Sequence, residues 1–264
     1  MEPTIVIPTV ILVGLLAAAL VPTLIAPYGP LEIAPAQSFS APSFQHWFGT
    51  DESGRDVFSR VVYGTRSSLL IGVFATIVGL GLGGILGVAA GLGRRSVDFG
   101  VSRLLEVLFA FPTLLLALLV ITIIGPGVVS TTLAVGLSTA PGYARLIRTQ
   151  VLSVRRSGYV EAAVALGRTD LFVIRKHVLP NVAAPLFVLA TLGIGQAVIW
   201  ASSLSFLGLG ATPPDPEWGS MLSAGRRYLS NAWWLTLFPG LFIVLGAAAT
   251  TVLGRNLQRR IKDR

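Results

Sequence analysis

Five long stretches of this chain contain no Asp, Glu, Lys or Arg, and they dominate its pattern of hydrophobic and polar positions. They cover residues 3–31, 67–93, 107–144, 177–214 and 228–254. A helix that crosses a membrane needs about 20 consecutive apolar residues, so each stretch can supply at least one such helix. The pattern therefore predicts an all-α integral membrane protein.

Two of these stretches decide how many helices there are. Stretch 107–144 is long enough for two, and Gly125-Pro126-Gly127 near its middle predicts a turn between them. Stretch 177–214 supplies only one, because Pro180 ends a helix near its start and Pro213-Pro214 break its end. We therefore predict six transmembrane helices in a single domain that covers residues 1–264. They are expected at about 5–25, 68–92, 105–124, 129–147, 183–209 and 233–253.

Glycine recurs at every fourth position of the second predicted span, at Gly79, Gly83, Gly87 and Gly91. This spacing leaves a smooth stripe on one helix face, where another backbone can approach closely. We predict tight static packing along the stripe. The alternative is a surface that slides when the membrane domain changes shape.

Lysine and arginine are distributed unevenly between the two sets of loops. Fifteen of them lie in the loops after the second and fourth predicted spans and in the C-terminal tail, whereas five lie on the opposite side. Loops rich in these residues face the cytoplasm, so we expect both termini to be cytoplasmic. The opening MEPT lacks the positive region of a cleaved signal peptide, and the first segment is expected to be a retained span.

The composition fits a membrane protein and limits the chemistry. Only 12% of the residues are charged, against about 25% in an ordinary soluble domain. The net charge of +8 follows from the loop asymmetry, and a nucleic-acid role would instead need one basic surface with aromatic platforms.

Catalytic and metal-binding patterns are missing from the sequence. There is no cysteine, and the two histidines, His46 and His177, fall on opposite membrane faces, so no metal site is expected. Neither Lys176 nor Lys262 stands in the Gly-Lys-Ser/Thr step of a phosphate-binding loop. We therefore predict that the chain is not an enzyme and that any ATP is bound by another polypeptide.

The loop between the fourth and fifth predicted spans, residues 148–181, contains a polar helix-turn-helix that reads SGYVEAAVALGRTDLFVIRKHVLPN from 157 to 181. Helical periodicity places Val160, Ala163 and Val164 on one side of a first short helix. Gly167 stands where a helix cap with positive φ is expected.

A second short helix is expected after this glycine. Thr169 or Asp170 can cap it, and its apolar stripe would consist of Leu171, Ile174 and Val178. Leu179-Pro180 should stop it, because the residue before a proline avoids the helical region. The result would be a rigid elbow on the cytoplasmic side.

The spacing of Glu161-Ala162-Ala163, Gly167 and Leu179-Pro180 resembles the cytoplasmic EAA loop of ABC-importer permeases, which docks onto a separate ATPase. HWFGTDESGRDVFSRVVYGTRSSL (46–69) and SLSFLGLGATPPDPEWGSML (203–222) are similar to external segments of the peptide/nickel class. More narrowly, they resemble the second, C-type permease of dipeptide and oligopeptide importers. His177 stands where the broad motif usually has an aliphatic residue.

This resemblance implies a type-I ABC-importer permease fold in the cytoplasmic (inner) membrane of a prokaryote. The expected partners are a second homologous permease, two ATPase subunits that bind ATP and Mg, and an external substrate-binding protein. The chain would form half of the translocation pathway for di- or oligopeptides and would bind no cofactor itself. The residues implied in ATPase coupling are Glu161, Ala162, Ala163, Gly167, Asp170, Leu179 and Pro180.

The remaining charged residues are interpreted by their spacing and position. Glu161 is expected to pair with Arg155, Arg156 or a basic residue of the ATPase. Arg103 and Glu106 have the spacing of an ion pair within a helix. Arg145 and Arg148, at the cytoplasmic end of the fourth span, are expected to reach the lipid headgroups.

Three other functions stay open at this level. The first is an importer of chelated nickel from the same class. The second is a stand-alone secondary transporter, although such proteins place ionisable residues at membrane depth and this chain has almost none there. The third is a membrane enzyme, which the scarcity of catalytic groups disfavours.

Overall fold

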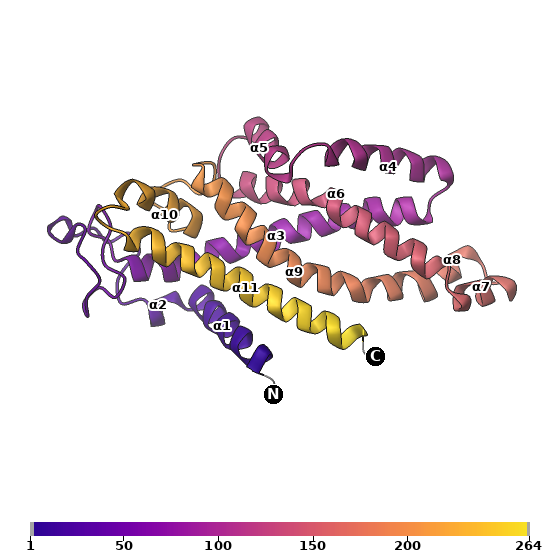
Figure 1. The fold of residues 1–264 in the computed structure, drawn as a ribbon, viewed down its shortest axis with the longest axis horizontal. Coiled ribbons are helices and arrows are strands. Elements are labelled where there is room, and N and C mark those ends of the chain that lie inside the picture. Colours follow the sequence, from indigo (N-terminus) through magenta and orange to yellow (C-terminus); the bar gives the residue numbers. More distant parts are fainter. Residues whose placement is uncertain (1–2, 263–264) are drawn as a thin grey trace.

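The computed structural model describes residues 3–262, and its regular elements are helices (Figure 1). The long helices are α1 (Pro3–Leu20), α3 (Val57–Leu92), α6 (Val128–Arg155), α9 (Leu179–Phe206) and α11 (Trp234–Lys262). The shorter ones are α2 (Pro22–Ile25), α4 (Arg95–Phe109), α5 (Thr113–Ile124), α7 (Gly158–Ala165), α8 (Asp170–Val173) and α10 (Trp218–Gly225). Single turns lie at Pro35–Gln37 (η1), Ile174–Val178 (η2) and Arg226–Tyr228 (η3).

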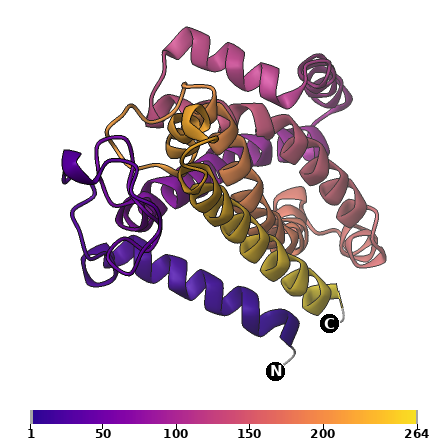
Figure 2. The ribbon, with the colours of Figure 1, turned by 60° about the vertical axis from the view of Figure 1, so that its left-hand side comes forward.

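The long helices form an elongated bundle in which α3 packs along α6, and α9 lies between α3 and α11. In Figure 1, α10 and the loops before α3 cover one end, and α7 and α8 form the other. Figure 2 shows α1 beside α11, with their free ends pointing the same way. Helices α4 and α5 lie outside the bundle, over α6.

Three helical segments are long and apolar enough to cross a membrane among the described residues. They are Val57–Leu92, Asp170–Phe206 and Trp234–Arg259. The pair α4–α5 adds a fourth if it counts as one span, and Ile5–Leu20 is apolar but shorter. Helix α6 contains the predicted fourth span, but it is not among these apolar segments, because its arginines and hydroxyl residues lower its mean hydropathy.

The predicted third span, 105–124, is not one straight helix. Helices α4 and α5 meet at an angle of 92°, and the bend lies at residues 110–112. Pro112 explains it, because proline has no N–H to donate within a helix and its ring clashes with the preceding turn.

The predictions that Pro180 ends a helix and that Leu179-Pro180 stop the elbow are wrong. The helix runs on from Asp170 to Phe206 through the π-helical turn Ile174–Val178. In this turn the Leu179 N–H bonds the Ile174 carbonyl, five residues back. The wider turn accommodates Pro180, which would clash with a regular α-helical turn before it.

The four-residue glycine stripe of α3 faces α6. A Cβ atom on Gly83 would lie 2.6 Å from the Tyr143 Cβ, and one on Gly87 would lie 2.6 Å from the Ala144 carbonyl oxygen. Gly79 and Gly91 are equally close to Thr139 and Val151 of α6. Two helices that approach this closely depend on the lack of side chains at the contact.

We expect Gly83→Ala to destabilise the protein relative to Gly84→Ala. Both changes raise helix propensity equally, but the Gly84 Cβ would meet nothing within 4 Å, whereas the Gly83 Cβ would press on α6. Overpacking of this kind costs about 1–3 kcal/mol. Thermal unfolding of the two purified variants in detergent measures the difference. Equal melting midpoints would show that α3 and α6 are not tightly packed at Gly83.

Candidate functional site

The turn after α7 is the first part of the elbow at the α7–α8 end of the molecule. Gly167 has φ of +74°, as expected for its position after the helix. Its N–H bonds the Val164 carbonyl at 2.9 Å, and the Arg168 N–H bonds the Ala163 carbonyl at 3.1 Å. These two bonds make a Schellman cap, in which the residue with positive φ is usually glycine.

The second part of the elbow begins at Thr169. Its hydroxyl accepts a hydrogen bond from the Phe172 N–H at 3.4 Å, so Thr169 rather than Asp170 caps α8. The π-helical turn then joins α8 to α9 without a break. The second half of the elbow is therefore continuous with α9.

The inner side of the elbow belongs to a hydrophobic cluster. Four buried elbow residues pack with buried residues of α6 and α9. The cluster includes Val160, Ala163, Val173 and Val178 from the elbow and Ile147, Val151, Val154 and Val182 from the two long helices. The predicted stripe is therefore partly wrong, because Leu171 is exposed and Val173 takes its place.

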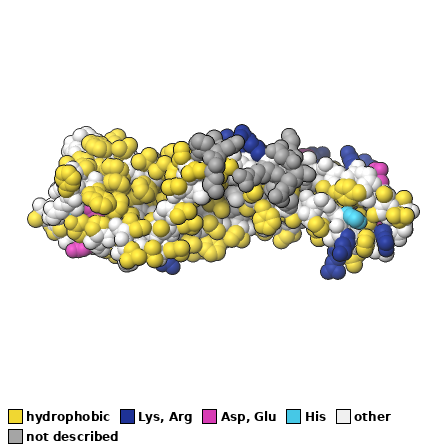
Figure 3. Space-filling view, turned by 90° about the horizontal axis from the view of Figure 1, so that it is seen from below, with side chains coloured by type: hydrophobic (Ala, Val, Ile, Leu, Met, Phe, Trp, Pro, Cys, Tyr) yellow, Lys and Arg dark blue, Asp and Glu magenta, His cyan; other side chains and the backbone are white. Residues whose placement is uncertain are grey.

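The outer side of the elbow exposes large apolar side chains. The exposed fractions are 80% for Leu166, 63% for Leu171 and 55% for Val164. Five basic residues lie in the same segment, at positions 155, 156, 168, 175 and 176. Figure 3 shows Lys and Arg side chains at this end, and apolar side chains cover much of the described surface toward the other end. An apolar patch with a charged rim is typical of a protein interaction site.

The residues implied in ATPase coupling divide between these two sides. Ala163 is buried, so it can hold the elbow together but cannot touch a partner. The other six are exposed: Glu161, Ala162, Gly167, Asp170, Leu179 and Pro180.

Glu161 makes no ion pair with Arg155 or Arg156 within the described part of the chain. Arg155 instead donates to the Gly91 carbonyl at 2.7 Å and ties α6 to the end of α3. Of the three expected partners of Glu161, a basic residue of another protein is the one still open.

His177 has a position that explains its presence in the motif. Its ring lies 5.9 Å from the Tyr159 ring and 5.8 Å from the Phe172 ring. It therefore packs between the two halves of the elbow, where an aliphatic residue would serve the same purpose. His46 lies in the loops at the other end of the molecule, far from a shared site.

Charged residues near the predicted cytoplasmic loops hold α4 in place. Arg148 donates two hydrogen bonds to Asp98, at 2.5 and 2.8 Å. Arg145 lies over the Phe109 ring at 4.1 Å. Both arginines therefore contact α4, and their expected reach to the headgroups stays a prediction. The Arg103–Glu106 pair is confirmed at 2.5 Å.

The sequence analysis missed the Asp98–Arg148 pair, although one signal was available. Both residues lie in segments assigned to the same membrane face, and they carry opposite charges.

At the opposite end, the loop before α3 is tied to the first turn of that helix. Asp56 caps α3 by accepting from the Ser59 N–H at 2.7 Å, and its other oxygen lies 2.9 Å from the His46 Nδ1. Arg60 donates to the carbonyls of Pro30 and Pro214 at 2.9 and 3.2 Å. Two loops far apart in sequence are thereby joined at the start of α3.

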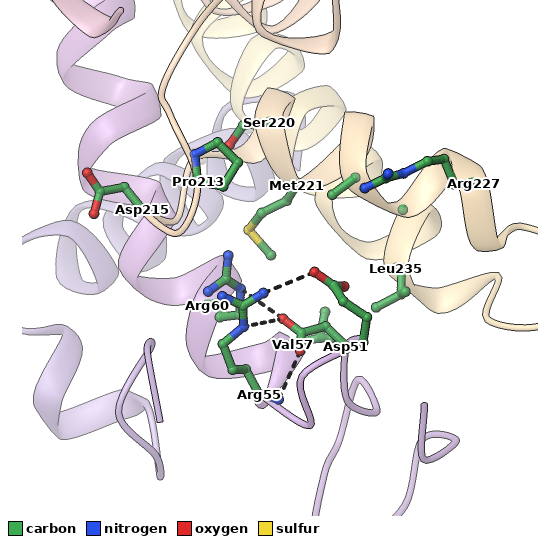
Figure 4. A pocket seen from close by; sticks show the side chains of 13 residues that line it. Asp51, Arg55, Val57, Arg60, Pro213, Asp215, Ser220, Met221, Arg227 and Leu235 are labelled. Carbon is green, nitrogen blue, oxygen red and sulfur yellow. Dashed lines mark hydrogen bonds and ion pairs between the residues drawn. The ribbon is translucent and has the colours of Figure 1, made fainter. Parts of the chain in front are cut away.

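A small pocket of about 140 Å³ lies between this loop and α10 (Figure 4). Three acidic and three basic side chains line it: Asp51, Glu52, Asp215, Arg55, Arg60 and Arg227. The Arg55 guanidinium bonds Asp51 at 2.7 Å and Glu52 at 3.1 Å, and Arg60 lies 3.6 Å from Asp51. These three ion pairs hold the loop before α3 against the first turn of that helix.

Glu217 fixes α10 against α3 and is only 1% exposed. Its carboxylate accepts from the N–H groups of Gly219 and Ser220 at 2.9 and 2.8 Å. Ser68 of α3 donates to the same group at 3.3 Å, and Trp218 donates from its indole to the Val61 carbonyl. Burial raises the pKa of Glu217, and the bonds it accepts oppose this.

Comparison with known proteins is informative over most of the chain. Residues 83–263 match the family described as binding-protein-dependent transport system inner membrane component. The chain is 42% identical over 242 residues to the dipeptide transport system permease protein DppC of Alkalihalophilus pseudofirmus. The aligned region covers 89% of this chain and 80% of that protein. It is also 42% identical over 217 residues to the glutathione transport system permease protein GsiD of Pectobacterium atrosepticum. That alignment covers 82% of this chain and 72% of GsiD.

Solved structures with the same fold include a chain of the MetNI methionine ABC transporter in inward-facing conformations. The TM-score is 0.63 at 19% identity, and the match covers 76% of this chain and 96% of that one. A chain of an amino acid ABC transporter with histidines also has a TM-score of 0.63, at 16% identity, with coverage of 77% and 94%.

We expect the stability of the protein to fall as pH rises through the range between the unfolded and folded pKa values of Glu217. Because the folded pKa is the higher of the two, the native state holds the proton more tightly and is favoured at low pH. Glu217→Gln should remove this part of the pH dependence. Melting temperatures between pH 4.5 and 8 measure it, with Glu32→Gln on the exposed loop as the control. Equal slopes for the two variants would contradict the assignment.

Proposed function

Since the chain belongs to the family of binding-protein-dependent transport system inner membrane components, we propose that it is the permease subunit of an ATP-driven importer of short peptides. The peptide assignment is supported by the relatives named for dipeptide and for di/tripeptide transport, at 42% and 39% identity. A chelated-nickel importer of the same class is the alternative substrate assignment.

The observation that carries this proposal is the two-sided construction of the elbow. Its inner side is packed into α6 and α9, and its outer side presents Leu166 and Leu171 to a partner. An ATPase that grips the outer side would move both long helices as one body. Only a partner whose affinity differs between two conformations can shift them, and ATP-dependent closure of the ATPases would provide that difference.

We assign the end with α7 and α8 to the cytoplasm, together with both termini. The basic surface at that end and the direction of α1 and α11 support this orientation (Figures 2 and 3). In this topology α1, α3, the α4–α5 pair, α6, α9 and α11 would be the six spans of one domain in the inner membrane of a prokaryote. Residues 148–181 would form the coupling loop.

The complete transporter would contain four kinds of subunit. A second homologous permease would supply the other half of the pathway, two ATPases would bind ATP and Mg, and an external protein would deliver the substrate. This chain would then hydrolyse no ATP and bind no metal. The loops around α10 and Arg60 would face that external protein.

The orientation can be tested with single cysteines, because the chain has none of its own. In cells that produce this chain without the ATPases, which would cover Leu166, we expect a membrane-impermeant thiol reagent to label Phe44→Cys before permeabilisation and Leu166→Cys only after it. Both side chains are exposed, Phe44 fully and Leu166 by 80%. The reverse pattern would place the elbow outside and end the coupling proposal.

The elbow can be tested at its turn. We expect Gly167→Val to reduce ATP-dependent dipeptide uptake about tenfold while membrane insertion is retained. A β-branched residue at positive φ costs at least about 1–2 kcal/mol, and 1.4 kcal/mol corresponds to a factor of ten. The measurement is uptake by vesicles that contain the complete transporter.

Gly158→Val is the matched control, because Gly158 lies on the same elbow, has no positive φ and has open space around it. It should retain most of the uptake. Normal uptake by Gly167→Val would show that the turn geometry does not matter. Competition between a dipeptide and a nickel chelate in the same vesicles separates the two substrate assignments.

A further inference from the structure

A second cavity, of about 170 Å³, lies where the bend between α4 and α5 meets α6 and α9. Its depth follows from the spans it touches. Ser138 is the middle residue of the predicted span 129–147, and Gln196 is the middle residue of 183–209. The bend at residues 110–112 lies close to the middle of 105–124. The cavity therefore sits near the centre of the membrane.

Three polar groups in this cavity have no hydrogen-bond partner within residues 3–262. They are the Gln196 amide, the Tyr143 hydroxyl and the Trp200 indole N–H. Tyr143 is only 9% exposed, and its hydroxyl lies against Gly193 of α9. The Trp200 N–H is buried, whereas the Gln196 side chain is exposed and also lines the cavity. In hydrocarbon an unsatisfied polar group costs several kcal/mol, so the buried N–H requires a polar occupant.

The backbone at the bend leads to the same conclusion. Pro112 cannot donate a hydrogen bond, and the chain interrupts its helix at membrane depth. Irregular backbone at this depth is tolerated where it is buried in protein or lines a water-filled path. The aromatic rings of Phe109 and Phe111 stand at the bend and line the cavity.

We propose that this cavity is a transit site for the backbone of the transported peptide. This inference rests on the proposed function. The Gln196 amide carries a donor and an acceptor, as a peptide group does, and can therefore bond both its N–H and its C=O. The Tyr143 hydroxyl provides a further bond, and the rings of Phe109, Phe111 and Trp200 pack against the side chain.

The chemistry of the lining favours a neutral peptide group over other occupants. No residue that lines the cavity is charged, so it does not select among side-chain charges. A lipid chain would leave the three polar groups unsatisfied. The volume is below the 300 Å³ at which pockets begin to hold drug-sized ligands, so the cavity takes one peptide group and its side chain, and the rest of the substrate extends beyond it.

The first test uses the cysteine-free background and the complete transporter. Gln196→Cys should react with a water-soluble thiol reagent at least about tenfold faster than Val244→Cys. Val244 lies at the same depth on α11, is 61% exposed and lines no part of this cavity. An alanine dipeptide delivered by the binding protein should slow the reaction at Gln196→Cys.

The outcomes separate the two levels of the proposal. Equal labelling rates would place the cavity in lipid, and labelling without protection by the dipeptide would make it a water-filled space only. Either result overturns the transit site while uptake by the unmodified transporter still supports the proposed function. Failure of that uptake would instead refute the proposed function.

The second test separates binding from folding. Gln196→Leu and Tyr143→Phe each remove hydrogen bonds and keep most of the side-chain volume. We expect dipeptide uptake to fall about three- to tenfold in each, as the loss of one net hydrogen bond predicts. ATP hydrolysis stimulated by the binding protein should stay within about twofold of the unmodified transporter. An equal fall in uptake and hydrolysis would indicate a structural role and contradict the proposal.

Discussion

The close contact between α3 and α6 is the constraint on which the rest of the molecule depends. Lipid tails are as apolar as the side chains, so the hydrophobic effect does not press two helices together within a membrane. Close packing must do so, and the glycine stripe provides it along the length of α3. At its N-terminal end α3 carries the Asp56 cap and the loops tied by Arg60. At its C-terminal end it receives Arg155 of α6.

The same contact sets the geometry of the central cavity. Tyr143 projects from α6 into a slot whose walls are Gly83 of α3 and Gly193 of α9, and a Cβ atom at either glycine would collide with it. The hydroxyl of the tyrosine lies against Gly193, and the residue also lines the cavity. The elbow follows the C-terminal end of α6. Its buried side belongs to the same hydrophobic cluster as Ile147 and Val151 of α6. In the proposed mechanism, a displacement of the elbow would act on the helix that positions the cavity wall.

The sequence predicted well those features that depend on local chemistry. The charge-free stretches located the long helices, and Gly167 fell at positive φ because its position in the motif requires it. The Arg103–Glu106 pair followed from helical spacing alone. These features involve residues within a few positions of one another, so the information is present in a short window.

The features that the sequence analysis missed depend on residues from different helices or on small adjustments of the backbone. The π-helical turn inserts one residue before Pro180, and a rule about proline alone could not foresee that accommodation. Arg148 pairs with Asp98 because α4 packs against α6, and the spacing of residues within one helix does not predict such a contact. The prediction of one unbroken helix over 105–124 concealed the cavity, since two of its aromatic residues stand at the bend beside Pro112. A break in a predicted span is therefore better read as a candidate site at membrane depth than as a defect in the span.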